Sequence, residues 1–469
     1  MNASPDKRLF YAFCALLVWL PLPLASNRAW AWSIMEIWSA SLFVFWCWLF
    51  FQNKVVISKS CYAARYVLFF FSLWLVYIAL QLKPLSVQVL TQLSPLSLAH
   101  WTALESNSVA TSISVDPKIT QLSLLLGISY FLVFFLTLVL VTNRRRLKTL
   151  ALTLVCSGLF QAVYGAVMTM SGWEYGFFIK KTLYLGVATG TFVNRNHLAG
   201  YLEMTMAIGI GLLIASLATE STTTTMKRKL LNLFRLLLSA KARLRLSLVM
   251  MVIALVLTHS RMGNTAFFLS LFITGVIGLV FSKHATRSMI VLLVSLVIID
   301  ILIVGQWFGF EKVQQRLEQT SEMSENRDEV YRYGFAQWQD YRLTGSGLGS
   351  FYAVFPQYRG VDVHGYNREA HNDYLQFATE TGVIGLILLA LITLISLFAA
   401  ILAHYRRRDP LMRGISFASI MGILAILIHS SVDFNLQIPA NAATFVVILA
   451  LAWVSLSLRH KAKSNASTE

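Results

Sequence analysis

Long apolar runs separated by short polar stretches make up most of the chain. A helix needs about 20 apolar residues to cross a hydrocarbon core of about 30 Å, and the runs have about that length. Strands of a membrane β-barrel would alternate in polarity, and these runs do not, so helices are the spanning structure that remains. The sequence predicts twelve spans, at residues 9–24, 31–51, 64–82, 120–142, 148–170, 197–218, 246–260, 263–281, 288–307, 374–403, 411–430 and 438–458.

The composition agrees with this pattern and excludes a soluble protein. Hydrophobic residues make up 57% of the chain, charged residues only 13%, and the mean hydropathy is +0.63. We therefore expect residues 1–469 to form a single all-α polytopic membrane domain. Two spans are weaker than the rest, because 9–24 contains Pro21 and Pro23 and 246–260 is short.

The net charge of +17 invites a nucleic-acid interpretation, but the positions of the charges favour a membrane protein. Most of the 39 Lys and Arg residues fall in alternate loops between the twelve predicted spans. This is the positive-inside pattern, and it predicts a multi-pass protein of the cytoplasmic membrane with both termini in the cytoplasm. Since the basic residues are scattered over many loops instead of forming one stripe, we expect no nucleic-acid partner.

The cysteines and acidic residues point to no metal or cofactor. Cys14, Cys47, Cys61 and Cys156 lie within or beside spans, at no metal-ligand spacing, and resemble small apolar residues. The sequence contains no Asp-x-Asp pair. The run from Gly345 to Gly349 lacks the Lys-Ser/Thr of a phosphate-binding loop, so an ordinary turn is the better interpretation.

The largest polar insertion, residues 308–372, lies between the ninth and tenth spans, on the outer side. A loop of this length is usually structured and functional. Asn326 is positioned to cap a helix. Helical spacing predicts two faces for that helix, one with Val330, Tyr333, Gln337 and Tyr341 and another with Tyr331, Phe335 and Trp338. A short aromatic helix is predicted at 351–358. The insertion could form a lid on the bilayer surface or simply pack against the bundle.

On the opposite side, residues 219–245 combine basic residues with interleaved leucines. This pattern is typical of an interfacial amphipathic helix that is attracted to anionic lipid. We therefore predict a cytoplasmic basic segment here and expect membrane lipid among the partners.

A first polar cluster, Thr189 to His197, precedes the sixth span. Arg195 would lie at the membrane boundary at the start of a helix, where a guanidinium fork and unpaired N–H groups both suit phosphate oxygens. Asn194, Asn196 and His197 would support it. Alternatively, Arg195 could snorkel to lipid headgroups. A second arginine, Arg261, lies in the tight outer turn between the seventh and eighth spans, where it is either functional or a simple topological stop.

A second polar cluster begins at His371, just before the tenth span. Histidine titrates near pH 6.5, so His371 is the candidate general base, with Asn372 and Tyr374 beside it. It could instead be a residue that caps the helix. Arg359 and His364 could bind sugar or phosphate or could belong to a solvated loop. Three further polar residues could line the same cavity: His429, Asp433 and Asn435.

Together the two clusters resemble a known family. The stretch Phe192-Val-Asn-Arg-Asn-His-Leu-Ala-Gly200, the stretch Gly345-Ser-Gly-Leu-Gly-Ser-Phe351 and the stretch from His371 to Gly382 resemble the O-antigen ligase/polymerase superfamily of bacterial membrane proteins. The overall plan, about twelve spans with a large outer loop before His371, also resembles this superfamily. The likeness covers most of the chain and is densest from about 185 to 385.

This resemblance implies a metal-independent, inverting glycosyltransferase with a GT-C-like fold and no cofactor, active at the periplasmic face of the inner membrane. The donor would be a glycan linked to undecaprenyl diphosphate. By analogy, Arg195 and Arg261 would hold the diphosphate and His371 would activate the acceptor hydroxyl. Ligation of O-antigen to lipid A core is the favoured reaction. Extension of a lipid-linked glycan by a polymerase and transfer to protein are alternatives.

A transporter of lipid-linked sugar is a further alternative of another class. It predicts charged residues deep inside the spans, lining a path. The predicted spans are nearly free of charge, with Glu36, Glu203 and Asp300 as the main exceptions, and the polar residues gather at one face. The sequence therefore favours an enzyme over a transporter.

Overall fold

The computed structural model describes residues 5–103, 111–217, 240–280, 321–363 and 368–458. The described part is helical apart from a two-stranded hairpin. Its helices up to the hairpin are α1 (Lys7–Trp19), η1 (Leu24–Ser26), α2 (Ala29–Phe51), α3 (Lys59–Ala63), α4 (Arg65–Gln81), α5 (Val87–Leu93), α6 (Pro95–Ala103), α7 (Pro117–Leu140) and α8 (Arg144–Ser171). The hairpin joins β1 (Tyr175–Gly176) to β2 (Ile179–Lys180). The remaining helices are α9 (Arg195–Leu217), α11 (Ala240–Leu257), α12 (Arg261–Val280), α15 (Ser321–Asp340), α16 (Phe351–Val354), η2 (Phe355–Gln357), α17 (Asp373–Arg406), α18 (Pro410–His429), η3 (Asn435–Gln437) and α19 (Pro439–Ser457).

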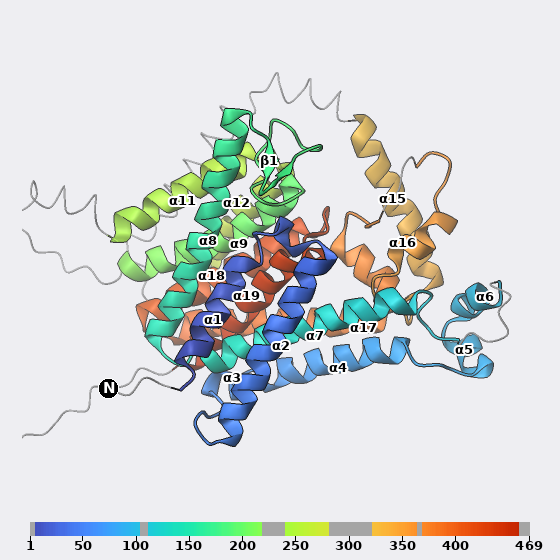
Figure 1. The fold of residues 1–469 in the computed structure, drawn as a ribbon, viewed down its shortest axis with the longest axis horizontal. Helices are drawn as coiled ribbons and strands as arrows, with labels where there is room; N and C mark the ends of the chain where they lie inside the picture. The colour runs from blue at the N-terminus through green and yellow to red at the C-terminus, as the bar shows by residue number, and fades with distance from the viewer. Residues whose placement is uncertain (1–4, 104–110, 218–239, 281–320, 364–367, 459–469) are drawn as a thin grey trace, which may run out of the picture.

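Helices α9, α18 and α19 form the centre of the bundle, and the other long helices surround them (Figure 1). Nearly all of α9 and α19 is buried by protein, whereas α2 and α17 leave most of their apolar surface exposed. Small residues permit the close packing at the centre. A Cβ added at Gly211 of α9 would lie 2.2 Å from the carbonyl oxygen of Gly414 in α18. Such close contact between small residues is typical of helices that associate in a membrane.

Eight helices in the described residues are long and apolar enough to cross a membrane: α2, α7, α8, α9, α12, α17, α18 and α19. They match eight of the twelve predicted spans. This pattern is that of a multi-pass membrane protein. The count of twelve stays a prediction, because the span 288–307 lies outside the described residues.

The other three predicted spans form helices of a different kind. Helix α1 ends at Trp19, before Pro21 and Pro23, and the chain turns there through η1. Helix α4 has 17 residues and is apolar but short. Helix α11 begins at Ala240, so residues 240–245 of the predicted basic segment continue into a longer helix. The rest of that segment, 219–239, lies outside the described residues.

The predicted insertion contributes α15, α16 and η2, and residues 308–320 and 364–367 of it are not described. The predicted face of α15 is buried at Val330, Gln337 and Tyr341, while Tyr331 and Phe335 are exposed. The expected cap at Asn326 is wrong, since α15 begins five residues earlier, at Ser321. One apolar cluster joins the insertion to α17, and its buried members are Val330, Phe351, Phe355, Val363, Ala370 and Leu375.

The glycine-rich turn after α15 lies against a break in α17. Gly382 has φ +61° and interrupts the helix, and Gly345 packs directly on the backbone of Glu380. The N–H groups of Ser346 and Gly347 donate to the carbonyls of Thr379 and Glu380 at 3.0 and 2.9 Å. The glycine-rich segment, which the sequence predicted to be an ordinary turn, therefore also packs on the backbone of α17 and fixes its first ten residues.

The long helices define two ends of the bundle. At the His371 end, α9 and α17 begin and α18 ends. At the Arg144 end, α8 and α18 begin and α9 and α17 end. A buried ion pair between Arg146 and Asp6, with N–O distances of 2.7 and 2.8 Å, fastens α1 to α8 at the Arg144 end.

Candidate functional site

Three turns with candidate residues meet at the His371 end of the bundle. Arg195 and Arg261 are the first residues of α9 and α12, and these helices pack together near their starts. A Cβ added at Gly263 would lie 2.5 Å from the Cβ of Ala199. The chain before Arg195 is also tied to the chain before Arg261, because the N–H of Ala188 donates to the carbonyl of Leu257 at 2.8 Å. The two arginines therefore begin neighbouring helices.

Phe434 connects the start of α9 to the start of α17. Its ring meets the ring of His197 edge-on, with centroids 4.6 Å apart, and meets the ring of His371 edge-on at 4.9 Å. One aromatic side chain thus lies between histidines from the two polar clusters that the sequence singled out. This contact brings the first cluster and the second cluster into one site.

His371 has a strained backbone conformation, with φ +52°. A positive φ is uncommon outside glycine and costs of order 1–3 kcal/mol, so it persists only where surrounding contacts impose it. The contacts follow at the next two residues. Asn372 caps α17, and the N–H of Asp373 donates to the carbonyls of Ser430 and Asp433 at 3.0 and 3.1 Å. The cap is therefore Asn372, and the alternative of a capping His371 is wrong.

The carboxylate of Asp373 holds this turn against the end of α18. It accepts from the hydroxyl of Ser430 at 2.7 Å, from the N–H of Leu436 at 3.0 Å and from the amide of Gln437 at 3.2 Å. Since the side chain is buried, these bonds compensate the loss of water. Asp373 thereby fixes the chain on which His371 sits.

Asp433 pairs with His197 next to Phe434. The Nε2 of His197 lies 3.7 Å from Oδ1 of Asp433, and both side chains are buried. Burial by itself raises the pKa of the Asp433 carboxyl, but the neighbouring imidazole of His197, the charge of His429 and the N–H of Phe434 outweigh it. The pKa of Asp433 therefore lies well below its usual range, and the group is a carboxylate near neutral pH.

A buried polar layer lies under these residues. Glu203 of α9 and His429 of α18 form a fully buried pair with 2.8 Å between Oε1 and Nδ1. Asn441 of α19 donates to the carbonyl of His197 and to the Oδ1 of Asn435, both at 2.9 Å. Gly200 is needed beside Asn435, because a Cβ there would lie 2.2 Å from the Asn435 amide oxygen. These bonds lock the starts of α9 and α19 together.

Arg195 is half-buried and lies over an aromatic ring. Its guanidinium carbon is 5.8 Å from the centroid of Tyr184. The loop that carries Tyr184 is held by Glu174 and Lys181, which pair at 2.6 Å, while Glu174 also accepts from the N–H of Gly186. Although partial burial opposes it, these contacts lower the pKa of Glu174, so the clamp is charged near neutral pH.

Arg261 is exposed and follows a rigid turn. His259 has φ +51°, the second strained histidine at this end of the bundle. The hydroxyl of Ser260 accepts from the N–H of Gly263, and its carbonyl accepts from the amide of Asn264 at 2.8 Å. The turn therefore presents Arg261 from the first residue of α12 with little freedom in the backbone.

The remaining predicted residues lie around these turns. Asn194 accepts from the N–H of Asn196 and starts α9, and Tyr374 donates to the carbonyl of Leu427 at 2.7 Å. Asn196 is half-exposed and Arg359 is exposed after η2. His364 lies outside the described residues.

The sequence did not single out Phe434, Tyr184 or Asn441. Phe434 stands in the polar run Ser430 to Asn435, which is a usable signal, but an aromatic residue there gives no sign of what it touches. The sequence did point to His429, Asp433 and Asn435. The structure places His429 and Asn435 in the layer under His197 and pairs Asp433 with His197 itself. Among the described residues, no three His, Cys, Asp or Glu side chains form a group that could hold a metal ion.

Comparison with known proteins gives one family match. Residues 246–390 match the family model described as O-Antigen ligase. The matched segment contains Arg261, the glycine-rich turn and His371, and it covers less than half of the chain. A search of curated proteins finds no match. The family match confirms the resemblance to the O-antigen ligase superfamily.

Proposed function

We propose that this protein transfers a glycan from undecaprenyl diphosphate to an acceptor hydroxyl, with O-antigen ligation to lipid A core as the reaction. The meeting of the Arg195, Arg261 and His371 turns at one end of a membrane-spanning bundle carries this proposal. The O-antigen ligase match over 246–390 supports the activity class. The enzyme would lie in the inner membrane, with a GT-C-like fold and its His371 end facing the periplasm.

The two arginines supply the charge that a diphosphate leaving group needs. A guanidinium presents paired donors to phosphate oxygens and keeps its charge at every relevant pH. Each arginine begins a helix, where the dipole also favours an anion. Charge stabilisation of this kind acts most strongly on the transition state, as the bond to the diphosphate breaks. No metal ion is needed for this part of the mechanism.

His371 takes the proton in the proposed reaction. The acceptor oxygen forms a bond to the anomeric carbon while the bond from that carbon to the diphosphate oxygen breaks. The electron pair of the broken bond leaves with the diphosphate, and the acceptor proton passes to His371. Attack from the face opposite the leaving group inverts the anomeric centre. The strained φ of His371 and its contact with Phe434 support a residue that is held for this purpose.

An in vitro transfer assay tests the function. Purified protein receives undecaprenyl-diphosphate-linked glycan with lipid A core, in EDTA, beside the variants His371→Ala and His100→Ala. His100, on α6, is the matched control, because this histidine lies at the same end of the bundle but outside the site. We expect glycan on lipid A core with the wild type and with His100→Ala, and none with His371→Ala. Equal transfer by His371→Ala would sink the proposal.

The same assay distinguishes ligation from polymerisation, the alternative that the family match also supports. A polymerase would lengthen the glycan on its lipid carrier when no lipid A core is added. The site residues are the same in both reactions, since only the acceptor differs. Longer chains on the carrier and no product on lipid A core would replace the ligase assignment with a polymerase.

A further inference from the structure

A second polar site lies at the Arg144 end, far along the same helices from His371. A pocket of about 830 Å³ opens between the start of α8, the end of α9, the start of α11 and the link from α17 to α18. Six basic residues and one acid line it: Arg144, Lys148, Lys241, Arg406, Arg407, Arg408 and Asp409. The pocket is therefore strongly cationic.

Contacts of Arg144 and Arg407 shape one side of the pocket. Arg144 pairs with the carboxylate of Asp409, which also caps α18 by accepting from the N–H groups of Leu411 and Met412. Arg407 donates to the carbonyl of Leu458 at the end of α19. These contacts build the wall and fix the link between α17 and α18.

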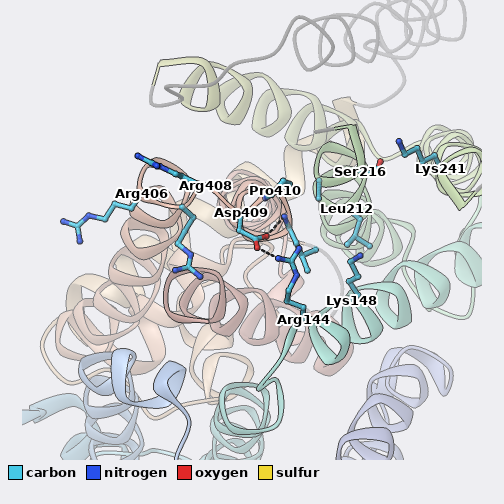
Figure 2. Close-up of a pocket in the computed structure, with 12 residues that line it drawn as sticks. Arg144, Lys148, Leu212, Ser216, Lys241, Arg406, Arg408, Asp409 and Pro410 are labelled. Carbon is cyan, nitrogen blue, oxygen red and sulfur yellow. Dashed lines mark hydrogen bonds and ion pairs between the residues drawn. The ribbon is translucent and has the colours of Figure 1, made fainter. Parts of the chain in front are cut away.

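The other basic residues supply charge around the opening. Lys148 and Lys241 approach from α8 and α11, with Ser216 beside Lys241, while Arg406 and Arg408 extend away to one side (Figure 2). The starts of α8 and α18 lie at the pocket, and the positive ends of their dipoles add to the field. An anion with several oxygens would be attracted here.

The pocket also has an apolar wall, formed by Leu212, Ala215 and Leu411. A soluble anion such as free phosphate gains nothing from such a wall, whereas a phospholipid places its glycerol and acyl carbons there. Basic pockets between helices at a membrane surface suit anionic lipid headgroups. The pocket lies where four candidate spans begin or end, which is the level of the headgroups.

We propose that this pocket binds the phosphate headgroup of an anionic phospholipid, held by Lys148 and Lys241 with its carbon chains against Leu212, Ala215 and Leu411. The site is independent of the proposed glycan transfer and lies at the opposite end of α9, α17 and α18.

Native mass spectrometry of the full-length protein in detergent tests this site. The probes are dioctanoyl phosphatidylglycerol, dioctanoyl phosphatidylcholine and inorganic phosphate. The double variant Lys148→Gln, Lys241→Gln removes the two lysines, and Lys54→Gln, Lys59→Gln is the matched control. The control removes two exposed lysines from the same end that do not line the pocket.

We expect the wild type and the control to bind phosphatidylglycerol at least about tenfold more tightly than phosphatidylcholine, and the pocket variant to lose that preference. The single variant Lys148→Glu should lose it too, which guards against a folding defect in the double variant. An unchanged preference in both pocket variants would overturn the site. Inorganic phosphate that displaces the lipid at equal concentration would overturn the lipid assignment.

Discussion

At the residue scale, three of the nine non-glycine residues with positive φ in the described part of the chain lie at or beside the groups proposed to do chemistry. Tyr184, His259 and His371 all have φ between +51° and +57°, and they lie beside Arg195, before Arg261 and at the proposed base. Each costs of order 1–3 kcal/mol. Such conformations persist only where the surrounding contacts impose them. The strain therefore supports a preorganised site for a charged substrate.

Replacement of Arg195 tests the anion site. Arg195→Ala should lower the transfer rate at least about 100-fold, because a charge that stabilises the leaving group is lost. Arg195→Lys should recover part of the rate, since the charge returns without the paired donors. The initial rate of transfer to lipid A core measures both. Arg28→Ala is the control, as Arg28 is exposed beside the start of α2, and wild-type rates for Arg195→Ala would refute the assignment.

Asp433 makes a prediction about pH. The partners of Asp433 lower the pKa of its carboxyl in the folded protein, although burial raises it. The ionised carboxylate therefore stabilises the fold at pH values above the unfolded pKa of about 3.9. This stabilisation is lost as the pH falls from there toward the folded pKa. Asp433→Asn should cost about 1–3 kcal/mol of unfolding free energy at pH 7, and the difference from wild type should shrink below about pH 4. Denaturant melts at pH 7, 5 and 3.5 measure it.

The matched control for this variant is Asp362→Asn. Asp362 pairs with the exposed Arg332 at 3.0 Å and accepts from the Tyr333 hydroxyl at 2.8 Å. An Asn keeps the acceptor for Tyr333, so loss of the charge alone should cost less than about 1 kcal/mol. A pH-independent difference between wild type and Asp433→Asn would show that the charge of Asp433 plays no part.

At the element scale, apolar run length predicted the helices well. The polar clusters that precede apolar runs predicted where α9, α12 and α17 begin. The periodicity of α15 predicted its buried face. Phe434 could not be found in this way. Its role arises when the link between α18 and α19 folds over turns distant in the chain, and an aromatic side chain carries no sign of such a long-range contact.

Gly345 shows how one element positions another. A Cβ at Gly345 would lie 2.2 Å from the carbonyl oxygen of Glu380, and the backbone has φ +72°. Gly345→Ala should therefore destabilise the fold by at least about 3 kcal/mol and lower transfer, because the first part of α17 must shift. Gly172→Ala is the matched control, since Gly172 has φ +71° and nothing within 4 Å of an added Cβ. It should cost only about 1–2 kcal/mol, the strain of the backbone alone.

Thermal and denaturant melts of the two glycine variants, together with their transfer rates, separate the contact from the strain. Equal destabilisation by Gly345→Ala and Gly172→Ala would mean that the contact with α17 contributes nothing. A stable Gly345→Ala protein with full activity would show that the start of α17 does not depend on the glycine-rich turn.

At the scale of the whole molecule, the two ends of the bundle differ in chemistry. The His371 end carries the strained histidines and the buried carboxyl groups of Asp373 and Asp433, and the Arg144 end carries the cationic pocket. The positive-inside pattern predicts that the Arg144 end faces the cytoplasm. The proposed donor and lipid A core would then reach His371 from the periplasm, while phospholipid of the inner leaflet would reach the pocket.

Single cysteines test this orientation. In a chain whose four cysteines are replaced, Val361→Cys reports on the His371 end, because Val361 is 98% exposed in the insertion packed on α17. Lys54→Cys reports on the Arg144 end, since it is exposed just after α2. A membrane-impermeant maleimide applied to spheroplasts should label Val361→Cys at once and Lys54→Cys only after lysis. The reverse pattern would place His371 in the cytoplasm, where a periplasmic transfer reaction could not occur.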